Sequence, residues 1–156
     1  MDDRIVNGVP GGYQSLTASI TVDGAAEAID YYQRAFGAVE VQRSPAPDGK
    51  KIWHAELRVG DTMLMLNDPF PEMGGPPANK EGGHPFGFWL YVPDVDAVYA
   101  AAVAAGGKAT SSVETQFWGD RTGSLTDPFG FSWTIATKVE VVSEEERRRR
   151  VAAFSA

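Results

Sequence analysis

The chain has 156 residues, 43% of them hydrophobic and 22% charged, which is enough for one domain with a substantial core but short for two independent domains. Its 14 Lys and Arg residues stand against 21 Asp and Glu residues, and the net charge of −7 argues against a broad nucleic-acid surface or attraction to anionic membranes. Cysteine is absent, no apolar run approaches about 18 residues, and the acidic first residues do not resemble a signal peptide, so we expect a cytoplasmic protein without disulfides or thiolate chemistry.

The first predicted elements are a strand at residues 16–22 and a helix that follows it. Apolar residues recur in this helix at spacings of three and four, which is the period of one helical face: Ala25, Ala28, Ile29, Tyr32 and Phe36. Gly37 is a natural C-terminal stop, and Asp23 or Gly24 can cap the other end. Three strands are predicted next, at 39–43, 51–59 and 62–67.

The same plan occurs a second time after a connection rich in proline and glycine at residues 68–86. The pattern predicts a strand at 88–92, a helix with Val95, Val98, Tyr99 and Ala102 on one face, and Asp94 as its cap. Three strands again follow, at 108–113, 119–126 and 131–137. The connection itself is either a lid over a pocket or a hinge across which the two halves pair.

The repetition predicts an α+β fold of two βαβββ modules. We place the modules at residues 12–67 and 87–138, the linker at 68–86, and a C-terminal helix at 143–154, all within one domain. Ser143 and Glu146 form a capping box, and glutamates precede arginines by four residues in the last helix. We therefore interpret "RRRR" at 147–150 as part of a charged helix and not as a nucleic-acid site.

Four stretches resemble the small bacterial glyoxalase-like branch of the vicinal-oxygen-chelate superfamily, the glyoxalase/bleomycin resistance protein/dioxygenase group. They are "AIDYYQRAFGA", "HAELRVGDTMLMLND", "QFWGDRTGSLTDPFG" and the terminal "SEEE…R" helix. The resemblance implies cupped mixed sheets, homodimers and ligand sites on the concave sheet. Many members hold one divalent metal with His or Glu from the first and fourth strands of each module, whereas others have lost it.

Superposing the two repeats places the four metal-ligand positions of the family at Thr17, Met65, Gly87 and Thr134. Divalent metals bind imidazole or carboxylate ligands, and none of these four residues supplies one. We therefore expect no metal and no cofactor. His54 and Glu56 share one strand face and can form half of a different site, although His54 can equally be a packed strand residue.

The hairpin "QFWGDRTGSLTDPFGFSW" at 116–133 is interpreted as scaffold, with Phe117, Trp118, Arg121 and Trp133 as candidate wall residues. Its neighbours Asp120 and Arg121 must lie on opposite strand faces. Strand alternation and the repeat register predict that eight residues contact a ligand: Thr17, Met63, Met65, Trp89, Tyr91, Arg121, Trp133 and Thr134. The alternative is that these residues fill a closed core.

An apolar, aromatic cup without metal ligands predicts a metal-free small-molecule-binding protein of the bleomycin-resistance type, which sequesters a metabolite or an antibiotic. We expect a homodimer and no nucleic-acid or membrane partner. The alternative is a metal-dependent lyase, epimerase or dioxygenase of the same superfamily, and the sequence favours binding over catalysis.

Overall fold

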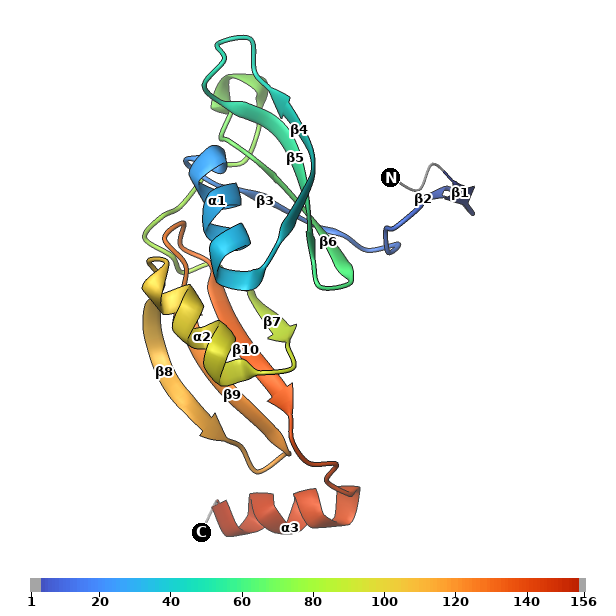
Figure 1. The fold of residues 1–156 in the computed structure, drawn as a ribbon, viewed down its shortest axis with the longest axis vertical. Helices are drawn as coiled ribbons and strands as arrows, with labels where there is room; N and C mark the ends of the chain where they lie inside the picture. The colour runs from blue at the N-terminus through green and yellow to red at the C-terminus, as the bar shows by residue number, and fades with distance from the viewer. Residues whose placement is uncertain (1–3, 155–156) are drawn as a thin grey trace.

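The computed structural model describes residues 4–154, which form two similar halves stacked along the long axis of the molecule (Figure 1). The first half holds a four-stranded sheet in the order β3-β6-β5-β4, in which β3 runs parallel to β6 and the other neighbours are antiparallel. Its elements are β3 (Ala18–Thr21), α1 (Ala25–Phe36), β4 (Val39–Pro45), β5 (Ile52–Val59) and β6 (Thr62–Asn67).

The second half repeats this topology. Its sheet has the order β7-β10-β9-β8, and β7 runs parallel to β10. Its elements are β7 (Gly87–Tyr91), α2 (Val95–Ala104), β8 (Lys108–Thr115), β9 (Asp120–Thr126) and β10 (Ser132–Lys138). The predicted α+β fold of two βαβββ units is confirmed, and most predicted strands agree with the observed ones to within two residues.

The two helices are capped in different ways. Asp94 caps α2 as predicted, because its carboxylate accepts a hydrogen bond from the Ala97 backbone N–H at 3.1 Å. The first turn of α1 has no local side-chain cap. Instead Asp68, which follows β6, accepts hydrogen bonds from the N–H groups of Gly24 and Ala25, both at 3.0 Å. Asp68, which is distant in the sequence, therefore caps α1 in place of the expected Asp23 or Gly24.

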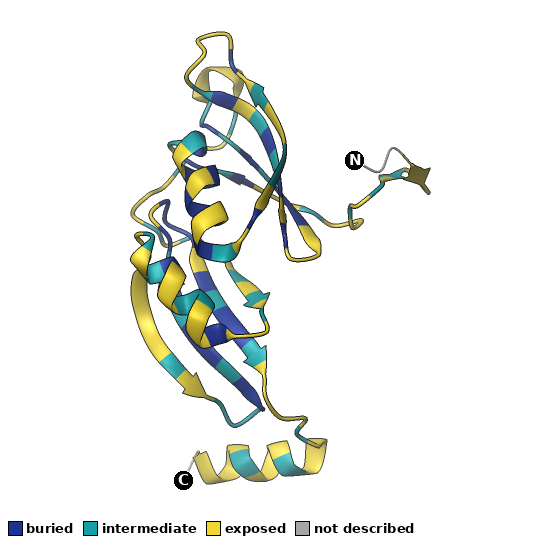
Figure 2. Cartoon of the chain, in the orientation of Figure 1, coloured by how far each residue is buried: buried dark blue, intermediate teal, exposed yellow. Residues whose placement is uncertain are grey.

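A single core joins the halves, because α1 packs against α2 and against the second sheet. The Tyr31 hydroxyl donates to the Ala102 carbonyl of α2 at 3.1 Å, and the Tyr32 ring lies 5.5 Å from that of Trp133 in β10. Figure 2 shows the buried residues concentrated along α1 and the central strands of both sheets. The two modules therefore share one hydrophobic core.

Two elements lie outside the modules. A short hairpin of β1 (Ile5–Val6) and β2 (Val9–Pro10) projects from the body of the molecule (Figure 1). Its turn residues Asn7 and Gly8 have φ values of 51° and 79°. An Asn-Gly turn between apolar residues is a strong hairpin signal, so this hairpin was predictable although it was not predicted. The linker contains one short 3-10 helix, η1 (Pro71–Met73).

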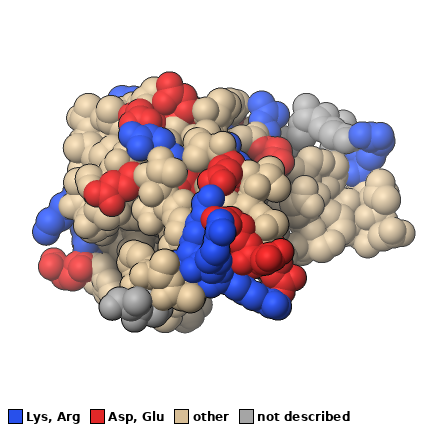
Figure 3. Space-filling view, turned by 90° about the horizontal axis from the view of Figure 1, so that it is seen from below, with Lys and Arg blue, Asp and Glu red and all other residues tan. Residues whose placement is uncertain are grey.

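The C-terminal helix α3 (Glu144–Phe154) is confirmed and covers one end of the molecule, where acidic and basic side chains lie side by side (Figure 3). The Glu146 N–H donates to the Ser143 hydroxyl at 3.1 Å, as a capping box requires. Arg150 pairs with Glu146 four residues earlier, but Arg149 pairs with Glu146 and not with the expected Glu145. None of the helices in the described residues is long and apolar enough to span a membrane.

Candidate ligand-binding site

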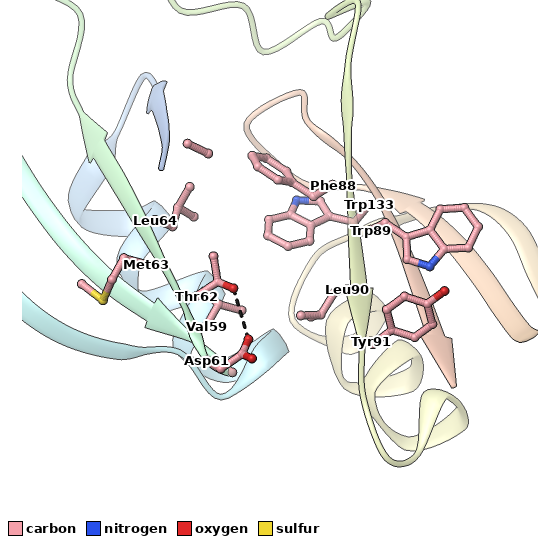
Figure 4. A pocket seen from close by; sticks show the side chains of 12 residues that line it. Val59, Asp61, Thr62, Met63, Leu64, Phe88, Trp89, Leu90, Tyr91 and Trp133 are labelled. Carbon is pink, nitrogen blue, oxygen red and sulfur yellow. Dashed lines mark hydrogen bonds between the residues drawn. The ribbon is translucent and has the colours of Figure 1, made fainter. Parts of the chain in front are cut away.

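A cleft lies between the edge strand β7 and the turn that joins β5 to β6 (Figure 4). Its volume is about 390 Å³. The side chains of Val59, Thr62 and Leu64 approach from the first module. Phe88 and Trp133 face them from the second, together with Leu90 of β7. The cleft is therefore apolar over most of its surface, and Asp61 and Thr62 supply polar atoms at one end.

Strand alternation separates β7 into two faces. Phe88 and Leu90 point toward the cleft, whereas the rings of Trp89 and Tyr91 point away from it, on the other side of the strand (Figure 4). Trp89 is 50% exposed and Tyr91 is 59% exposed. Large aromatic rings with this exposure are available for contact with another molecule.

A buried carboxylate holds Tyr91 and a third aromatic residue, Trp118. Asp120, at the start of β9, is 2% exposed, and its Oδ2 accepts hydrogen bonds from the Tyr91 hydroxyl and from Trp118 Nε1, both at 2.9 Å. Lys138 Nζ lies 3.2 Å from the other oxygen, Oδ1. Burial by itself would raise the pKa of Asp120, but the hydrogen bonds from Tyr91, Lys138 and Trp118 outweigh burial and lower this pKa below its usual value.

We call Trp89, Tyr91 and Trp118 the aromatic corner. The Trp89 ring lies 6.4 Å from the Tyr91 ring and 6.4 Å from the Trp118 ring, tilted by 47° and 52° respectively. Trp118 reaches β7 from the turn between β8 and β9. Sequence reasoning placed Trp118 in the wall but missed Asp120 as the residue that holds Tyr91 and Trp118, because a lone Asp in a hairpin gives no signal of its burial.

Two predicted contacts of the second module lie away from this corner. Asp120 and Arg121 do occupy opposite faces of β9, as expected, and Arg121 turns toward α2, where its guanidinium pairs with Asp96 at 2.8 Å. Trp133 borders the cleft but is only 3% exposed, and its Nε1 donates to the buried Asp127 at 2.9 Å. Thr134 stays on the Trp89 face, where it pairs with Trp89 across the ladder.

The three predicted contacts of the first module do not gather around a common cavity. Thr17 precedes β3, and its hydroxyl donates to the Gln14 carbonyl at 3.2 Å. Met63 borders the cleft, but its side chain points away from it (Figure 4). Met65 pairs with Glu56 on the face of the sheet opposite the core. The eight predicted residues therefore divide between the cleft, the aromatic corner and the separate face of the first sheet, except for Arg121, which pairs with Asp96 of α2.

The residues at the metal-ligand positions of the family do not fit a divalent ion. In the ladders Met65 pairs with Ser19 and Glu56, and Thr134 pairs with Trp89 and Ser124. These cross-strand neighbours add hydroxyls and one carboxylate, that of Glu56, which is too few ligands to hold a divalent ion. Elsewhere in residues 4–154, no three His, Asp or Glu side chains are grouped so that they can hold a metal.

His54 and Glu56 contact each other on β5, with 3.0 Å between His54 Nε2 and Glu56 Oε1. Burial raises the pKa of Glu56, but Tyr13 and His54 together lower it below its usual value. The pKa of Tyr13 is raised by burial and by the adjacent Glu56 carboxylate. The three side chains form a small polar cluster on the first sheet, apart from the cleft.

Comparisons with known proteins agree with this architecture. The family model described as "Glyoxalase/Bleomycin resistance protein/Dioxygenase superfamily" matches residues 14–135. The protein Rv0887c of Mycobacterium tuberculosis, which is described as uncharacterized, is 44% identical over 135 residues, covering 85% of this chain and 79% of the relative. The protein At5g48480 of Arabidopsis thaliana, also described as uncharacterized, is 30% identical over 127 residues, covering 78% of this chain and 76% of the relative.

Solved structures show the same fold. The crystal structure of TioX from Micromonospora sp. ML1 aligns with a TM-score of 0.63 at 26% identity, over 81% of this chain and 99% of that one. The X-ray structure of the Arabidopsis thaliana At5g48480 product aligns with a TM-score of 0.64 at 28% identity, over 80% of this chain and 98% of that one. The repeated βαβββ topology, the family match and these relatives together lead to one conclusion: the chain belongs to the glyoxalase/bleomycin resistance protein/dioxygenase superfamily.

Proposed function

We propose that the protein binds an apolar or aromatic small molecule in the cleft between β7 and the β5–β6 turn. The observation that supports this proposal most directly is the cleft itself, whose volume of about 390 Å³ lies within the range of small-molecule pockets. Leu64, Phe88 and Leu90 would bury the apolar part of the ligand. Asp61 and Thr62 would orient any polar group at the end of the cleft.

Binding is favoured over metal-dependent catalysis because the family's ligand positions hold Thr17, Met65, Gly87 and Thr134. The proposed role is sequestration of a metabolite or an antibiotic, as the name of the bleomycin-resistance group suggests for other members. Metal analysis of the purified protein separates this role from that of a metal-dependent lyase, epimerase or dioxygenase. Stoichiometric Zn, Mn, Fe or Ni, with turnover that depends on it, would contradict the proposal.

Thr62→Trp is expected to weaken ligand binding at least tenfold by filling the cleft. Thr62 is exposed at the start of β6 and its side chain points into the cleft (Figure 4), so an indole there occupies ligand space without entering the core. A thermal-shift screen of aromatic compounds would find a ligand, and calorimetry would give its affinity for each variant. Thr110→Trp, at an exposed position of β8, is the matched control. Equal affinity of the two variants would place the ligand elsewhere.

We also propose that the protein is a homodimer. Both β3 and β7 are edge strands that pair on one side only, and edges of this kind are usually covered in native proteins. Light scattering after size-exclusion chromatography is expected to give twice the chain mass of 16.8 kDa. A mass of 16.8 kDa at every concentration would show that the edges remain uncovered.

A further inference from the structure

We propose that the aromatic corner, formed by Trp89, Tyr91 and Trp118, is a binding site for an alkylammonium cation. Trp89 and Tyr91 border the cleft along β7, but their rings point to the opposite side of the strand (Figure 4), so the ring faces form a different surface from the cleft. The proposal assigns the site a ligand of a different chemical class from the apolar ligand of the cleft. It does not depend on the cleft being occupied.

The arrangement of the rings favours a round group over a flat one. Trp89 lies 6.4 Å from each of the other two rings, and the tilts of 47° and 52° exclude face-to-face stacking within the corner. A flat ligand that stacked on Trp89 would be parallel to neither of the other two rings. A compact trimethylammonium group can contact more than one face at once, at the distance of about 6 Å or less that cation–π attraction requires.

The electrostatics of the corner favour a cation as well. The Tyr91 O–H and the Trp118 N–H both donate to Asp120 Oδ2, at 2.9 Å each. Donation to a carboxylate increases the electron density of the donor's ring, and this strengthens the attraction of the ring face for positive charge. Asp120 is almost fully buried, so water screens its effect on the two rings only weakly.

The corner is also held in place before any ligand arrives. Lys138 Nζ donates to the Trp118 carbonyl at 3.1 Å, and Arg150 of α3 donates to the Phe117 carbonyl at 3.0 Å. The Phe117 ring contacts the Trp118 ring edge-on, with 5.0 Å between their centroids. A turn fixed from two sides loses little conformational entropy on binding, which favours affinity for a small ligand.

Lys138 is the charge that opposes the proposed ligand. Its ammonium lies 3.2 Å from Asp120 Oδ1 and neutralises that carboxylate. Removing this positive charge should therefore strengthen the binding of a cation, whereas it would weaken the binding of an anionic aromatic ligand. The side chain is 47% exposed, and Lys138→Gln removes its positive charge while it keeps an N–H donor for the Trp118 carbonyl, so this variant separates the two classes of ligand.

The test compares choline with its neutral carbon isostere 3,3-dimethylbutan-1-ol, by calorimetry and tryptophan fluorescence on the full chain. We expect choline to bind at least tenfold more tightly than the isostere, Trp89→Ala to weaken choline at least tenfold, and Lys138→Gln to strengthen it. Trp53→Ala is the matched control, because Trp53 is a similarly exposed tryptophan (47%) on the first sheet. Circular dichroism would confirm that each variant is folded.

Equal affinity for choline and the isostere would overturn the proposal, as would an equal loss in Trp89→Ala and Trp53→Ala. Weaker choline binding in Lys138→Gln would also overturn it, in favour of an anionic ligand. Thr62→Trp is expected to leave choline binding unchanged while it blocks the cleft. Failure of the cation site is therefore distinguishable from failure of the proposed function, which concerns uncharged ligands of the cleft.

Discussion

Asp127→Ala is expected to lower the free energy of unfolding by about 4 kcal/mol or more. Asp127 is 4% exposed and accepts four hydrogen bonds. Oδ1 accepts from the backbone N–H of Phe129 at 2.9 Å and of Phe131 at 3.0 Å. Oδ2 accepts from the Tyr32 hydroxyl at 2.6 Å and from Trp133 Nε1 at 2.9 Å. Alanine would leave these donors without their acceptor, and each unsatisfied buried donor costs about 1–3 kcal/mol.

Urea denaturation followed by circular dichroism would measure this loss. Asp30→Ala is the control, because Asp30 is a 64% exposed residue whose pair with Arg34 should contribute about 0.5 kcal/mol or less. Tyr32→Phe removes one donor and should give an intermediate loss of about 1.5–3 kcal/mol. If Asp127→Ala were no more destabilising than Asp30→Ala, the network would not be what joins α1 to the second module.

Gly130→Ala is expected to cost about 3 kcal/mol, the second largest effect, through two independent causes. Gly130 has a φ of 93°, a conformation that L side chains rarely adopt. A Cβ at this position would also lie 2.2 Å from the carbonyl oxygen of Asn79 and 3.0 Å from the backbone nitrogen of Gly82. The variant must therefore push the linker away from the turn before β10.

Gly12→Ala isolates the first cause, because Gly12 has a φ of 82° but no atom within 4 Å of its Cβ position. We expect this control to lose only about 1 kcal/mol. Gly130→Ala should in addition speed the cleavage of the linker by trypsin after Lys80, which lies in the displaced segment. Equal stability and equal cleavage in the two variants would show that the linker is not held by this contact.

The contact of Gly130 with Asn79 and Gly82 also indicates where the linker lies. The sequence left open whether residues 68–86 form a lid or a hinge. The start of the segment contacts the first module, where Asp68 caps α1 and the Phe70 ring lies 6.5 Å from that of Trp53. Its end contacts the second module, where the His84 ring is stacked on Phe131 at 4.2 Å. None of the residues that line the cleft comes from this segment. The observed arrangement therefore does not support a lid over the cleft.

The elements that local chemistry specifies were predictable from the sequence. The helix α1 has the bounds that its apolar period and Gly37 indicated, and Asp94 caps α2 as its position suggested. The duplicated strand order followed from the repeated pattern. These features depend on residues a few positions apart, and for this reason a single sequence is sufficient to identify them.

The candidate sites depend on contacts between distant residues, and only the tertiary structure decided them. Alternation required Trp133 and Thr134 to lie on opposite faces of β10, but it did not say which face was buried. Trp133 faces inward because its Nε1 donates to Asp127 and its ring contacts that of Tyr32 in α1. Tyr32 lies 95 positions before Asp127 and donates to the same carboxylate.

Two other contacts join segments that the sequence does not link. Asp68 caps α1, and the buried Asp120 accepts hydrogen bonds from Tyr91 and Trp118. The sequence by itself determined the repeated modules and the order of their strands, whereas packing across the strands decided which side chains border the cleft and which point away from it.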